Sequence, residues 1–112
     1  MRVRCQSNQC PDGRSAALTI GETYEVLGIE GGDFRVLDDA GSPVLYEPPL
    51  FEIIDEGRPS DWTSETIDGE EYAGPPEFNR PGFWEDYHDN EPKARALFAR
   101  YLNRHLRTTD AA

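Results

Sequence analysis

The stretch WEDYHD, residues 84–89, combines residue types that can do chemistry, because it sets His88 among three carboxylates. A histidine beside carboxylates can act as a general base or bind a metal. Catalysis would also need a nucleophile or a second histidine, and none lies nearby in the sequence. Carboxylates just before a helix are ordinary helix caps, so we predict capping here. An enzyme that uses His88 with Glu85 or Asp89 is the alternative.

The two cysteines, Cys5 and Cys10, lie in the stretch CQSNQC. A zinc site usually has four ligands at recognisable spacing, and neither histidine lies near this stretch. A disulfide that closes so short a loop would stabilise the fold little. We therefore predict that Cys5 is a small buried residue on the first strand and that the chain holds no metal. Because the sequence also has no GxGxxG, P-loop, GxSxG or HExxH motif, we predict no cofactor and no enzymatic activity.

Net charge is the strongest signal in the whole sequence. The chain has 22 acidic and 11 basic residues, a net charge of −11. Residues 1–21 sum to +2, residues 22–91 to −17 and residues 92–112 to +4. An acidic body of this kind repels nucleic acid and anionic lipid, and it attracts a basic protein. The alternative is that the acidic surface only keeps the protein soluble.

The sequence gives no sign of membrane insertion or export. A membrane span needs about 18 or more consecutive apolar residues, and a signal peptide needs an apolar region after its basic start. Neither pattern occurs, since Met1-Arg2-Val3-Arg4 is followed by polar residues. We predict a soluble, cytoplasmic protein.

Acidic residues are interleaved with aromatic ones in a way that suits partner binding. Aromatic side chains supply buried anchors at interfaces, while carboxylates supply charge complementarity. Three of the acids fall at predicted hairpin tips, and the others crowd a segment beside two aromatic residues. The predicted partner-binding residues are Asp33, Asp38, Asp39, Trp62, Glu65, Asp68, Glu70, Glu71 and Tyr72. The alternative is a solvated loop whose aromatic residues only pin it to its own fold.

The first half of the chain reads as a series of short β-strands. Apolar, branched and aromatic residues at positions 3–5, 24–29, 34–37 and 44–46 are separated by turn residues such as Gly31-Gly32. Pro48 and Pro49 cannot donate ladder hydrogen bonds, but they suit the start of a tight helical turn. Residues 51–54 then resume as a closing strand. The spacing predicts a small antiparallel barrel or roll.

The segment LTIGETYEVLGIEGGDFRVLDDAGSPVLYEPPLFEIID resembles short bacterial and phage proteins of Src-homology-3-like fold. These proteins open with an LT-x-G-x-x-Y-x-V stretch and close with a double-proline turn before LFE. The resemblance covers residues 1–56 and implies a small barrel. It implies little about function, because such barrels host many activities. The aromatic groove that binds proline-rich ligands in eukaryotic members has no convincing match here.

The second half of the chain changes character. Residues 57–82 are rich in glycine, proline and acids, and we predict a long connection, with disorder as the alternative. Its isolated apolar anchors are Trp62, Ile67, Tyr72 and Phe78. Residues 83–107 predict a C-terminal helical segment capped by Asn90, with an apolar stripe at Ala94, Leu97, Phe98, Tyr101, Leu102 and His105 that packs on the barrel. Residues 1–112 thus form one mainly β domain with a C-terminal α-helix.

Together these features predict a non-enzymatic, acidic inhibitor of another protein. The most specific hypothesis is an immunity protein that neutralises a basic bacterial toxin by covering its active site. The resemblance permits this, because bacterial toxin systems use many small acidic antidotes. The alternative is a phage or mobile-element protein that mimics DNA and occupies a nucleic-acid-binding protein. We predict no binding to nucleic acid or membrane in either case.

Overall fold

The computed structural model describes residues 1–105, and the chain divides into two compact units, residues 1–76 and residues 77–112. The predicted helix end at residue 107 and the packing predicted for the His105 side chain lie outside the described part. Among the described residues, no helix is both long enough and apolar enough to cross a bilayer.

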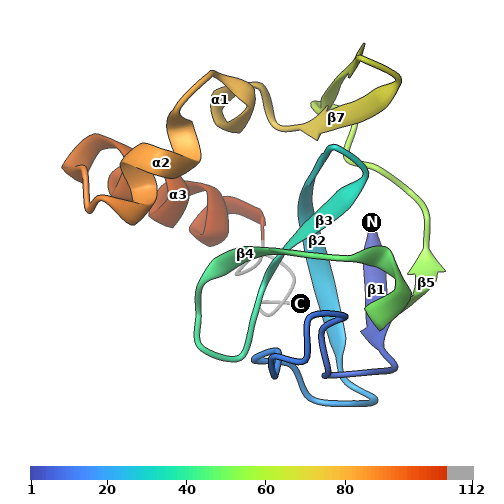
Figure 1. The fold of residues 1–112 in the computed structure, drawn as a ribbon. Helices are drawn as coiled ribbons and strands as arrows, with labels where there is room; N and C mark the ends of the chain where they lie inside the picture. The colour runs from blue at the N-terminus through green and yellow to red at the C-terminus, as the bar shows by residue number, and fades with distance from the viewer. Residues whose placement is uncertain (106–112) are drawn as a thin grey trace. The chain divides into compact units, whose positions relative to one another are not determined.

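The first unit is an antiparallel β structure (Figure 1). Its order is β4-β3-β2-β1-β5, with β7 also paired to β2 and β6 paired to β7. The strands are β1 (Arg2–Cys5), β2 (Thr23–Glu30), β3 (Asp33–Leu37), β4 (Pro43–Tyr46), β5 (Phe51–Asp55), β6 (Thr63–Ile67) and β7 (Glu70–Gly74). A 3-10 turn, η1 (Pro48–Leu50), joins β4 to β5, as the two prolines predict.

Alternating apolar residues of these strands form the core. Val3 and Cys5 of β1 are almost completely buried, while Arg2 and Arg4 between them face solvent. Gly31 and Gly32 have φ values of +61° and +88°, which lets β2 turn directly into β3. The predicted antiparallel strands and the buried position of Cys5 are confirmed. A barrel is not confirmed, because the sheet is not closed: no ladder joins β4 to β5 in the described residues.

Residues 63–74 form a β-hairpin where the sequence predicted a connection without regular structure. Asp68 and Gly69 have φ values of +53° and +82°, and they make the two-residue turn between β6 and β7. Trp62 packs partly against the core, as predicted for an anchor. Ile67 does not, because its side chain is 47% exposed.

The second unit is helical and is built around aromatic rings. It contains α1 (Pro76–Asn79), α2 (Phe83–His88) and α3 (Pro92–His105). The ring of Phe78 lies 4.8 Å from that of Phe83 and 4.9 Å from that of Tyr101. Phe98 of α3 lies 5.0 Å from Tyr87 of α2, so the predicted apolar stripe of α3 has its partners inside this unit. Packing of this helix on the β unit stays a prediction.

The start of α3 differs from the prediction. The helix begins at Pro92, so Glu91 directly precedes it, and Asn90 does not act as the N-cap. Asn90 instead has a φ of +62° in the turn, and its side-chain oxygen accepts a hydrogen bond of 2.8 Å from Arg95. Proline suits the first helical position because its missing N–H would have no partner there.

Candidate functional site

The net charge of the chain belongs entirely to the first unit. Residues 1–76 contain 16 acidic and 5 basic residues, a net charge of −11, whereas residues 77–112 contain 6 of each and sum to zero. The boundary between the units is therefore also a boundary of charge.

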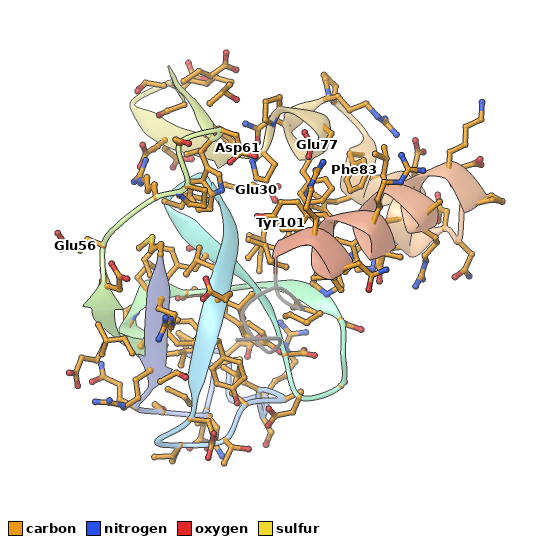
Figure 2. The ribbon with its side chains drawn as sticks, turned by 180° about the vertical axis from the view of Figure 1, so that it is seen from behind. Glu30, Glu56, Asp61, Glu77, Phe83 and Tyr101 are labelled. Carbon is orange, nitrogen blue, oxygen red and sulfur yellow. The ribbon has the colours of Figure 1, made fainter. Side chains whose placement is uncertain are left out.

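All five arginines of the first unit already have carboxylate partners. The pairs are Arg2–Glu25, Arg4–Glu52, Arg14–Asp12, Arg35–Glu30 and Arg58–Glu71, with distances from 2.6 to 3.9 Å. The other eleven of the sixteen acidic side chains have no ion pair among the described residues. Figure 2 shows two acids, Glu30 and Asp61, near the β6–β7 hairpin, and Glu56 after β5. Of these three, Glu30 is the carboxylate that pairs with Arg35, whereas Glu56 and Asp61 have no ion pair among the described residues.

The β6–β7 hairpin gathers several of these carboxylates on one face. Its register pairs Glu65 with Tyr72 and Ile67 with Glu70, and residues paired across two strands share a face of the sheet. We call Glu65, Ile67, Glu70 and Tyr72 the Glu65 face. It combines two unpaired carboxylates, an aromatic ring and an apolar side chain that is 47% exposed. An aromatic ring and an exposed apolar side chain bordered by carboxylates match the apolar centre and polar rim of a binding surface.

The Glu65 face lies against the turn between β2 and β3. A Cβ atom on Gly31 would lie 2.9 Å from Glu70 Oε2 and 3.5 Å from Tyr72 Oη, so glycine gives these side chains room. Asp33 begins β3 beside them. Partial burial raises the pKa of Asp33, and the nearby charge of Glu70 raises it further. Asp33 therefore adds a third carboxylate to this surface, and Asp68 lies at the hairpin turn.

The opposite face of the hairpin carries Glu71, whose carboxylate already forms an ion pair with Arg58. Arg58 donates two hydrogen bonds to its carboxylate, of 2.7 and 2.9 Å, and Ser64 donates a third of 3.0 Å. These bonds lower the pKa of Glu71. The Arg58 guanidinium lies 6.0 Å from the centre of the Trp62 ring. Glu71 and Trp62 thus hold the residues around β6 and β7 in place.

A groove of about 450 Å³ opens beside this opposite face. Its volume lies in the range of pockets that hold a small-molecule ligand. Its apolar part is formed by Ile29, Phe34 and Ile53, and its polar part by Glu56, Arg58 and Glu71.

Asp38 and Asp39 lie apart from the other predicted binding residues. At about 3.3 Å per residue, β3 separates Asp33 from Asp38 by roughly 16 Å. Asp38 is only 8% exposed and accepts hydrogen bonds from two turn amides and from the Tyr46 hydroxyl. Asp39 accepts hydrogen bonds of 2.7 Å from the Thr19 and Tyr24 hydroxyls, which lower its pKa. Asp38 holds its own turn, whereas Asp39 ties that turn to Thr19 and Tyr24, so neither carboxylate belongs to the Glu65 face.

The WEDYHD stretch, the other candidate for chemistry, lies in the second unit, and most of it is in α2. His88 is an exposed residue at the end of α2, and its ring lies edge-on to Tyr87 at 5.3 Å. Gly82 occupies the N-cap of α2, while Glu85 and Asp86 lie in its first turn. Within residues 1–105, no group of three or more histidine, cysteine or acidic residues is arranged to hold a metal ion.

Sequence reasoning found the acids and aromatics of this surface but missed the hairpin that arranges them. The Asp68-Gly69 dipeptide between residues 63–67 and 70–74 was the available signal, since Asp-Gly favours a two-residue hairpin turn. Nothing in the sequence indicated that the side chain of Ile67 would be exposed. Comparison of the chain with protein families, with curated proteins and with solved structures finds no match.

Proposed function

We propose that this chain is a non-enzymatic inhibitor of a basic protein, and most specifically an immunity protein that neutralises a bacterial toxin by covering its active site. The observation that carries the proposal is the unpaired charge of the first unit. Its five arginines are matched by five acids, and eleven further acids remain without an ion pair in the described chain. A toxin that acts on nucleic acid or nucleotides has a positive cleft, which such a surface complements.

The Glu65 face is the part of the first unit that we propose touches the partner. Carboxylates alone give attraction at long range and fast encounter, but affinity also needs anchors that exclude water. Tyr72 and Ile67 supply them beside Glu65 and Glu70. A DNA mimic would need carboxylates in regular rows like phosphates, whereas these acids surround an aromatic and apolar patch. This arrangement supports the antidote over the mimic.

The proposal includes the Src-homology-3-like fold and a cytoplasmic location. The order β4-β3-β2-β1-β5 and the 3-10 turn before β5 support the fold, although the sheet is open. Both cysteines are free thiols, which fits a reducing compartment.

The proposal is tested by capture followed by rescue of growth. The tagged chain is incubated with lysate of its native cell at low and high salt, and each retained basic protein is then expressed alone and together with the chain. A cognate toxin should stop cell growth when it is expressed alone, and growth should continue when the chain is expressed with it. Glu65→Lys with Glu70→Lys should weaken binding by about 100-fold or more, because loss of charge complementarity at an interface costs several kcal/mol.

The matched control reverses two other exposed acids, Glu22→Lys with Glu47→Lys, which changes the net charge by the same amount. This variant should still rescue growth. Equal loss in both variants would show that only total charge matters, and rescue by the folded Glu65→Lys, Glu70→Lys variant would reject the Glu65 face. A retained protein that DNA displaces, and that does not stop growth, would favour the DNA mimic.

A further inference from the structure

The outer edge of β6 is an open strand edge. β6 pairs with β7 on one side only, and no other ladder to β6 is seen in residues 1–105. All five of its residues are exposed. A strand edge with unpaired N–H and C=O groups is a template for an added strand.

The hairpin turn determines which backbone groups point outward. In a hairpin with a two-residue turn, the flanking pair Ile67–Glu70 exchanges hydrogen bonds, and hydrogen-bonded and non-bonded pairs then alternate. Thr66–Glu71 and Ser64–Ala73 are therefore the non-bonded pairs. The carbonyl of Glu71 agrees with this alternation of bonded and non-bonded pairs. It points away from β6 and accepts a hydrogen bond of 3.3 Å from the Gly32 amide. Ser64 and Thr66 thus direct their amides and carbonyls outward.

This edge has little of the usual protection. Natural edge strands are blunted by proline, by lysine and other charged side chains, or by a β-bulge, and the only such feature in β6 is the carboxylate of Glu65. The sequence TSETI contains neither proline nor lysine, and its register with β7 is continuous over all five pairs. Threonine and isoleucine favour extended backbone. The edge is therefore straight, regular and open to pairing.

The charge around the edge selects its occupant. Glu65, Asp68 and Glu70 surround it without an ion pair in the described chain. A second copy of the chain would bring the same carboxylates together and be repelled, whereas lysine and arginine side chains would be attracted. We propose that the outer edge of β6 accepts an extended, basic segment of the partner as an added β-strand. The inference rests on the proposed function and names how that partner docks.

The proposal is tested with a blocked eight-residue peptide of alternating lysine and valine. A peptide of alternating lysine and proline has the same charge but cannot form a strand ladder. NMR titration of the full chain should show that the lysine–valine peptide binds at least about tenfold more tightly than the lysine–proline peptide. Its binding should slow hydrogen exchange at the Ser64 and Thr66 amides, because these amides become paired.

A proline substitution isolates the backbone contribution. Thr66→Pro removes one outward amide and leaves the bonds to β7, a change that edge strands tolerate. It should weaken the lysine–valine peptide by about tenfold, as expected for a lost hydrogen bond and a blocked edge. The control Thr66→Val keeps the amide and should bind as the natural chain does.

The inference would be overturned by equal affinity of the two peptides, by unchanged exchange at Ser64 and Thr66, or by a dimer of the free chain that Thr66→Pro abolishes. The last would assign the edge to a second copy. Toxin rescue that survives Thr66→Pro but fails in Glu65→Lys, Glu70→Lys would also overturn it, while leaving the proposed function intact. Loss of rescue in both variants, with retained folding, would support it.

Discussion

The carboxylate of Asp38 should stabilise the β3–β4 turn strongly, and this can be measured. Its Oδ1 accepts bonds of 3.0 and 3.1 Å from the Ala40 and Ser42 amides, and its Oδ2 accepts one of 2.7 Å from the Tyr46 hydroxyl. A hydrogen bond to a charged group contributes about 1.5–3 kcal/mol, and water can replace part of what the turn amides lose. We therefore expect Asp38→Ala to lower the free energy of unfolding by about 3 kcal/mol.

The bond to Tyr46 is separated from the others by a double-mutant cycle. Burial raises the pKa of Tyr46, and the hydrogen bond to Asp38 raises it further, so the hydroxyl stays a neutral donor at ordinary pH. Tyr46→Phe alone should cost about 1.5–2 kcal/mol, since it leaves one carboxylate oxygen without its donor. The double variant should be less destabilised than the sum of the two single ones, by about 1.5 kcal/mol.

The assay is equilibrium unfolding in urea of the natural chain, both single variants and the double variant. The slope against urea must stay constant, because a changed slope would mean a change of state rather than of stability. A coupling energy below about 0.5 kcal/mol would refute the structural role given to this hydrogen bond. Weaker partner binding by Asp38→Asn at unchanged stability would return Asp38 to the binding surface.

Four further outcomes are expected. Asp33→Asn should stabilise the fold at pH 7, because the folded-state pKa of Asp33 is raised and its ionisation therefore opposes folding. In unfolding measured against pH, this gain in stability should vanish below about pH 4, where Asp33 is protonated in the unfolded chain as well. Gly31→Ala should cost about 1 kcal/mol in urea unfolding, since alanine disfavours a φ of +61° and its Cβ would displace the flexible Glu70 carboxylate. Phe98→Ala should cost about 3–5 kcal/mol in the same assay, because it empties the centre of an aromatic cluster. Added salt should raise the melting temperature, because a Debye length of about 10 Å at 0.1 M screens repulsion among the unpaired acids; a melting temperature that falls with salt would contradict this.

The strands of the first unit could be predicted because local chemistry and tertiary pairing agree there. Branched and aromatic residues are frequent in β2 and β3, and Gly31-Gly32 supplies the positive φ values of their turn. The hairpin of β6 and β7 is different, since glutamate and aspartate are poor strand formers. Its conformation depends on β7 pairing with β2, in which Ile29 meets Ala73 across more than forty intervening residues. No local pattern reports a pairing at that separation.

The two acids of the β3–β4 turn show a second limit of sequence reasoning. Aspartate is common in turns either because it faces solvent or because it bonds to nearby amides, and the two cases have the same local sequence. Asp38 bonds to turn amides and to Tyr46, eight residues away, so its role depends on how β4 pairs with β3. Asp39 accepts hydrogen bonds from the Thr19 and Tyr24 hydroxyls, 20 and 15 residues away, which the sequence around it does not indicate either.

The division of charge between the two units argues that the acidity has a use beyond solubility. Selection for solubility acts on the whole surface, and it would leave a net negative charge on both units. The second unit instead balances six acidic and six basic residues, while the first holds all eleven excess negative charges. Self-repulsion in a unit of this size lowers its stability. We propose that a cationic partner offsets this cost, because exposed carboxylates such as Glu65 and Glu70 would gain in the complex the ion pairs that they lack in the described chain.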